Sequence, residues 1–123
     1  MSEAGKAEAR VPAASDVEKI RQRVEEMVRR IVDQFHPERI ILFGSHARGT
    51  AGPDSDVDLL VVMRVSGSKR KLATQIDLAL AGIGLPKDII VVTPEEVQRY
   101  RDIVGTIIYP AVREGRVVYE RVA

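Results

Sequence analysis

Three aspartates at the beginnings of apolar runs are the residues best placed to do chemistry. Asp56 and Asp58 open one run, and Asp88 directly precedes another. Side chains alternate along a strand, so Asp56 and Asp58 point to the same face. Without a partner, such neighbouring carboxylates repel each other and bear a desolvation cost, and divalent cations can supply the charge that balances them. Hard oxygen ligands select Mg²⁺ or Mn²⁺, and two such ions about 3.5–4 Å apart can clamp a phosphoryl group during in-line displacement.

Asp88 is a candidate third carboxylate. If its strand pairs beside the strand of Asp58, Asp88 can lie on the same face of the sheet. There it could complete the shell of one ion and accept the proton of an attacking hydroxyl. Each of these aspartates alone is more often a solvated charge at a turn or strand edge. Their combination with a glycine-serine turn favours the chemical interpretation.

That turn lies in the stretch FGSHARGT, from Phe43 to Thr50, which follows the apolar run RIILF. The stretch almost matches the phosphate-binding P-loop, G-x-x-x-x-G-K-[ST], but Thr50 stands where the P-loop needs lysine. A second strand also follows after a few residues, where a P-loop needs a long helix. These differences argue against a P-loop. They leave a turn without chemistry, or another kind of phosphate-binding turn.

Short apolar runs of strand length surround these residues. One run, 39–43, precedes the glycine-serine turn, and another, 57–63, is nearly all apolar, as is typical of a strand buried on both faces. Turn-forming residues at 51–55 separate the two. We expect two further strands at 89–93 and 117–120.

Three stretches have the apolar spacing of amphipathic helices. The first spans 17–35 and the second 72–83. The third begins with Thr93 as its N-cap, and we expect it to break near Gly105 and Pro110. This order of elements predicts an α/β (α+β) domain, with a small mixed sheet of about four strands flanked by helices.

The composition excludes several classes of protein. The 123 residues suit one domain with a modest core, and the absence of cysteine excludes a disulfide scaffold and a thiolate metal site. A formal net charge of +1 gives no general basic field, so nucleic acid is not expected as a direct ligand. No apolar run approaches the roughly 20 residues that span a bilayer, and the N-terminus has no secretory pattern. We expect a cytoplasmic protein without membrane contact, with residues 1–14 as a mobile tail.

The motifs resemble those of a known family. The pattern of Gly44-Ser45, ten residues and then Asp56-x-Asp58 resembles the fingerprint of the nucleotidyltransferase superfamily that includes DNA polymerase beta. The text GSHARGTAGPDSDVDLLVV resembles the minimal nucleotidyltransferase (MNT) family, PKDIIVVTPEE resembles its third-aspartate strand, and GTIIYPAVREGRVVYE resembles its C-terminal end. The resemblance implies a polymerase-beta-like fold, with residues 15–123 as a single nucleotidyltransferase domain.

The resemblance also implies roles for the candidate site residues. Gly44 would let the backbone approach the β and γ phosphates of a nucleotide, and Ser45 would supply a hydroxyl and N–H donors at a short helix N-terminus. Arg48 would either assist there or form a surface ion pair. The metal ligands would be Asp56 and Asp58 for both of two Mg²⁺ ions (or Mn²⁺) and Asp88 for the catalytic ion, with Asp88 also a candidate base.

The implied reaction is nucleotidyl transfer, in which a hydroxyl attacks the α-phosphate of an NTP and pyrophosphate leaves. The expected elements leave no separate region to hold the acceptor. We therefore expect that another protein supplies the acceptor site, or that the acceptor is itself a protein that docks. In the family that protein is commonly a helical HEPN-domain toxin, and the MNT protein is an antitoxin that transfers AMP from ATP onto its tyrosine (AMPylation). The alternatives are an antitoxin that neutralises its partner by binding alone, or transfer to a small molecule or RNA with another subunit. The protein could form homo- or hetero-oligomers under any of these interpretations.

Overall fold

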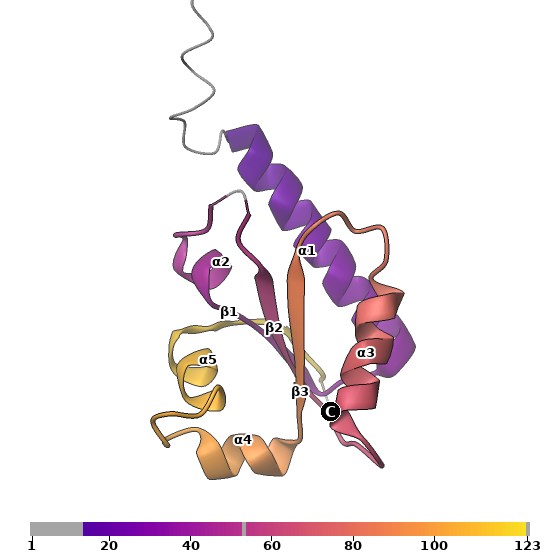
Figure 1. Cartoon of the computed structure of the whole chain (residues 1–123), viewed down its shortest axis with the longest axis vertical. Helices are drawn as coiled ribbons and strands as arrows, with labels where there is room; N and C mark the ends of the chain where they lie inside the picture. Colours follow the sequence, from indigo (N-terminus) through magenta and orange to yellow (C-terminus); the bar gives the residue numbers. More distant parts are fainter. Residues whose placement is uncertain (1–13, 53, 123) are drawn as a thin grey trace, which may run out of the picture.

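The computed structural model describes residues 14–52 and 54–122, which form four strands and five helices (Figure 1). The expected tail, residues 1–14, lies outside the described residues apart from Ala14. The elements are α1 (Ala14–Phe35), β1 (Arg39–Phe43), α2 (Ser45–Arg48), β2 (Val57–Val62), α3 (Lys69–Ala79), β3 (Lys87–Val92), α4 (Pro94–Tyr100), α5 (Ile108–Glu114) and β4 (Arg116–Glu120). None of the described helices combines the length and apolarity needed to cross a membrane.

The strands form one mixed sheet in the order β3-β2-β1-β4. β1 is antiparallel to both β2 and β4, whereas β2 and β3 are parallel. Parallel neighbours need a crossover connection, and α3 supplies it. The predicted small mixed sheet flanked by helices is confirmed.

Helices cover both faces of the sheet, which divides the core into two clusters (Figure 1). On one face, α1 and α3 pack against Val57, Leu59 and Val61 of β2. On the other face, α4 and α5 pack against Leu60 and Val62. Because β2 is buried on both faces, its sequence is a nearly continuous apolar run rather than an alternating one.

The third predicted helix is broken, but one of the two expected causes is wrong. α4 begins with a capping box at Thr93 and ends at Tyr100, and residues 101–107 form the break. Gly105 lies in this break with a φ of 101°. Pro110 instead lies inside α5 as its third residue. The first N–H groups of a helix have no partner within the helix, so proline is tolerated there.

Gly115 allows α5 to pass closely over the sheet. A Cβ at this position would lie 2.2 Å from the carbonyl oxygen of Ala111 and 2.6 Å from Cγ2 of Ile41. One of these atoms belongs to the last turn of α5 and the other to β1. The absence of a side chain therefore sets the distance between α5 and β1.

We predict that Gly115→Ala destabilises the protein by about 1–3 kcal/mol, because backbone atoms must shift to admit the methyl group. Urea unfolding followed by circular dichroism measures this change. Gly52→Ala is the matched control, since a Cβ there would meet nothing nearer than the Ser55 hydroxyl at 4.0 Å. The control should lie within about 0.5 kcal/mol of wild type. Equal stability of the two variants would contradict the close packing of α5.

Candidate active site

The parallel pairing of β2 and β3 brings two of the three candidate aspartates side by side. Asp58 and Asp88 are each the second residue of their strand, and they are direct register partners. Partners in neighbouring strands project from the same face, and the strands lie about 4.8 Å apart. The expectation that the third strand pairs beside the second is therefore met. Asp56 lies two residues before Asp58, just ahead of β2.

The aspartates face the side of the sheet that carries α4 and α5. Every second residue of a strand lies on the same face, so Asp58 shares a face of β2 with Leu60 and Val62. These two residues pack on the side of α4 and α5. α4 and α5 cover the other ends of β2 and β3 and leave the aspartate end open (Figure 1). Asp56 and Asp88 are exposed and Asp58 is half-buried. The three carboxylates thus lie on an open part of the sheet.

Gly44 is the point where the end of β1 passes the carboxylate of Asp58. The last residue of β1, Phe43, is the register partner of Asp58. A Cβ on Gly44 would lie 2.2 Å from Oδ2 of Asp58, and Gly44 has a φ of 76°. Both the close approach and the positive φ require glycine. The glycine-serine turn and the aspartates are therefore parts of one arrangement, although they are separated in the sequence.

The turn continues into α2, a single helical turn from Ser45 to Arg48. The N–H groups of Ala47 and Arg48 donate to the carbonyl oxygen of Gly44, each at 3.1 Å. Those of Ser45 and His46 have no acceptor in the part of the chain that the structure describes. Free N–H groups at the start of a helical turn can donate to an anion such as a phosphate.

His46 helps to hold the loop that leads to β2. Its Nε2 lies 3.2 Å from the carbonyl oxygen of Ser55 and donates to it. The hydroxyl of Ser55 in turn accepts from the N–H of Gly52 at 2.9 Å. These bonds connect the loop before Asp56 to α2. His46 therefore has a structural partner.

Arg48 forms the ion pair that was one of its two predicted roles. Its guanidinium lies 3.9 Å from the carboxylate of Glu114 at the end of α5, and both side chains are more than half exposed. Its charge also acts on Asp58, where it favours the ionised form. The charge of Arg48 thus interacts with both Glu114 and Asp58, and a role in nucleotide binding stays a prediction.

The electrostatics of the site favour a cation. Burial raises the pKa of the Asp58 carboxyl above its ordinary value, and the charges of Asp88 and Asp56 raise it further. The positive charges of His46 and Arg48 offset this only in part. Among the residues described, no three His, Asp or Glu side chains are already arranged as a metal cluster. The three carboxylates are the hard oxygen donors that a divalent cation such as Mg²⁺ prefers.

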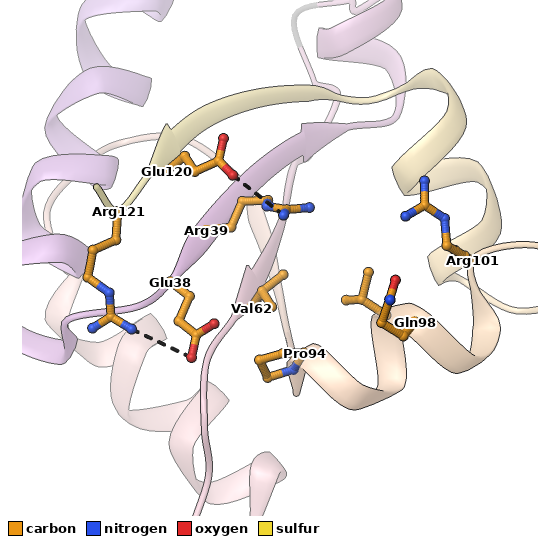
Figure 2. Close-up of a pocket in the computed structure, with 9 residues that line it drawn as sticks. Glu38, Arg39, Val62, Pro94, Gln98, Arg101, Glu120 and Arg121 are labelled. Carbon is orange, nitrogen blue, oxygen red and sulfur yellow. Dashed lines mark ion pairs between the residues drawn. The ribbon is translucent and has the colours of Figure 1, made fainter. Parts of the chain in front are cut away.

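Two cavities lie away from the aspartates. One, of about 420 Å³, lies at the opposite ends of the strands, between α4, the start of β1 and the end of β4 (Figure 2). The other, of about 700 Å³, lies between α1, β4 and α2. The arginines of the first cavity, Arg39, Arg101 and Arg121, were not identified from the sequence. They are far apart in the chain, and no local pattern connects them.

We predict that Asp58→Asn raises the thermal unfolding midpoint in EDTA-containing buffer at neutral pH. A raised carboxyl pKa means that folding disfavours the charged form, so its penalty grows as pH rises through the unfolded and then the folded pKa. The variant should gain most near pH 7, and the difference should close toward about pH 4, where the wild-type carboxyl is increasingly protonated.

The matched control is Asp54→Asn, since Asp54 is exposed in the same loop and is not among the charges that act on Asp58. Its unfolding midpoint should follow that of wild type at every pH. A lower midpoint for Asp58→Asn at pH 7 than for wild type would contradict the electrostatic assignment.

Known proteins with this architecture include nucleotidyltransferases. A protein of Sulfolobus solfataricus assigned as a nucleotidyltransferase aligns with a TM-score of 0.65 at 20% identity, over 94% of this chain and 93% of that chain. A mutant MntA–HpeT toxin–antitoxin structure gives a TM-score of 0.53 at 17% identity, over 79% and 73%. A toxin–antitoxin structure with AMP-PNP gives 0.51 at 19%, over 86% and 74%. A search of curated proteins gives no match.

At these identities the structural likeness establishes the fold, which is the polymerase-beta-like nucleotidyltransferase fold that the sequence motifs predicted. The family evidence comes from the sequence itself. Residues 17–110 match the family model of the nucleotidyltransferase domain, from α1 into α5. This protein therefore belongs to the nucleotidyltransferase domain family.

Proposed function

We propose that this protein is a Mg²⁺-dependent nucleotidyltransferase that moves AMP from ATP onto a hydroxyl of a protein partner and thereby acts as an antitoxin. The observation that carries the proposal is the register of Asp58 with Asp88, with Asp56 and the Gly44 turn beside them. Nucleotidyl transfer needs a cluster of carboxylates that can hold divalent cations, and a turn that can bind the phosphates of the nucleotide.

The turn is the proposed site for the β and γ phosphates of ATP. The N–H groups of Ser45 and His46 are available as donors at the start of α2, and the hydroxyl of Ser45 adds a third. The lack of a side chain on Gly44 lets the turn pass directly beside the Asp58 carboxylate, so phosphates bound at the turn would lie near the carboxylates. Arg48 can turn from its long ion pair with Glu114 toward the phosphates, because that pair is exposed and weak.

Asp56, Asp58 and Asp88 are the proposed ligands of the divalent cations, Mg²⁺ or Mn²⁺. Bound there, the ions would neutralise the carboxylates and stabilise the negative charge that develops on the transferred phosphoryl group. The chain's own contribution is position and proton transfer. Asp88 is exposed at the start of β3, so its carboxylate can accept the proton of the attacking hydroxyl. The hydroxyl oxygen bonds to the α-phosphorus as the bond to pyrophosphate breaks.

The proposed acceptor is a tyrosine of a HEPN-domain toxin. Two structures with this fold are toxin–antitoxin structures, one of them with AMP-PNP, and the motifs of the chain resemble the MNT family that pairs with such toxins. The open position of the aspartates also suits a protein acceptor. A docked partner could bring its tyrosine over Asp88 and exclude water from the reacting groups.

The product of the gene next to this one is the first candidate for the proposed HEPN-domain partner. We predict that this protein adds one or more AMP groups to that product when the two are co-expressed. Intact-mass spectrometry of that partner measures the modification. Asp58→Asn should abolish the mass gain, because the central carboxylate of the group is lost. Asp54→Asn should retain it, because Asp54 is exposed and outside the group.

The other outcomes separate the alternatives. A partner that binds and is neutralised without any mass gain, by wild type and Asp58→Asn alike, would favour an antitoxin that acts by binding alone. Retained modification in Asp58→Asn would contradict the assignment of the carboxylates. A partner that neither binds nor changes mass would direct the search to small-molecule or RNA acceptors.

A further inference from the structure

The break between α4 and α5 exposes a group of apolar side chains, which we call the loop patch. Its members are Ile103, Val104 and Ile107, whose relative exposures are 46%, 76% and 46%. In contrast, Ile108 and Ala111, which follow the loop patch in the sequence, are buried in the core. Three branched apolar residues exposed within five positions of one loop favour a surface that another protein covers.

The cavity of Figure 2 includes a residue that lies next to the loop patch in the sequence. Arg101 precedes Ile103 by two residues and lines this cavity together with Arg39 and Gln98. Figure 2 shows Arg39 and Val62 on one side of the cavity and Gln98 and Arg101 on the other. Polar donors from two elements therefore surround a partly apolar space of about 420 Å³.

One of the three arginines that line the cavity has no carboxylate partner among the described residues. Arg39 pairs with Glu120 and Arg121 pairs with Glu38, each at 3.5 Å, so both carboxylates are used. Arg101 has no carboxylate partner within the part of the chain described here. A carboxylate is the group that complements an unpaired guanidinium. The cavity is therefore suited to an acidic side chain of a partner.

The loop patch and this cavity lie on the same side of the sheet as the aspartates. α4 and α5 pack on the face of Leu60 and Val62, from which Asp58 also projects. Ile90 of β3 lies on this face, half-buried, between the register positions of Asp88 and Val92. A protein seated on the loop patch can therefore extend along this face to the carboxylates.

We propose that the loop patch and the cavity beside Arg101 are the docking surface for the acceptor protein, which contacts them through a segment with apolar side chains next to a carboxylate. The identity of the occupant as the acceptor rests on the function proposed above. The docking surface and the carboxylate site are separate parts of the chain, so binding and transfer can be tested separately.

The test measures the affinity of the full chain for the purified product of the neighbouring gene by isothermal titration calorimetry. Val104→Asp and Arg101→Glu should each weaken binding by about tenfold or more, as is typical when an interface anchor is replaced. Leu78→Asp is the matched control, because Leu78 is 68% exposed on α3, on the other face of the sheet. It should bind as wild type does. Thermal unfolding of each variant checks that the fold is retained.

Asp58→Asn separates the two proposals, since it should bind with wild-type affinity but leave the partner unmodified. Binding that depends on Val104 and Arg101, without modification by wild type, would support the docking surface and count against the transfer reaction. Unchanged binding by Val104→Asp and Arg101→Glu would overturn the docking surface, even if the partner is modified. Absence of binding by the wild-type chain would overturn it as well.

Discussion

Three negative charges held at one end of a sheet are the constraint on which the rest of the structure depends. β2 and β3 are parallel because α3 crosses over one face between them, and their register makes Asp58 and Asp88 neighbours. An antiparallel pairing would have placed Asp88 near the other end of β2. The arrangement raises the pKa of Asp58, so it costs stability when no cation is present. Proteins retain such costs where function requires them.

Two glycines let the surrounding elements close around these charges. Gly44 allows the end of β1 to turn directly over the Asp58 carboxylate, and Gly115 allows α5 to pass close to β1. α2 and α5 are then near enough for Arg48 to reach Glu114. At Gly44 and Gly115 the backbone thus approaches its neighbours too closely to admit a Cβ, and this positions β1, α2 and α5 around the site. The long ion pair of Arg48 with Glu114 connects α2 to α5.

Local sequence patterns predicted most of the helices and strands well. The apolar run of β2, the N-cap at Thr93 and the glycine-serine turn each depend on neighbours in the sequence, so each could be read directly. The effect of Pro110 was misjudged because it depends on where α5 begins, which the tertiary packing of Ile108 and Ala111 decides. The pairing of Asp58 with Asp88 could be stated only as a condition on strand order. The cavity of Arg39, Arg101 and Arg121 joins three separate segments and had no signal in the sequence. The catalytic and binding roles of the aspartates and of Gly44, Ser45 and Arg48 stay predictions.

The most direct test of the carboxylate site counts the Mn²⁺ ions bound per chain in the presence of AMP-PNP, by electron paramagnetic resonance of the free ion. If Asp56, Asp58 and Asp88 hold the cations, the wild-type chain should bind about two ions. Asp58→Asn should lose most of this binding, and Asp54→Asn should keep it. Equal Mn²⁺ binding by the wild-type and Asp58→Asn chains would contradict the assignment of these carboxylates as a metal-dependent nucleotide site.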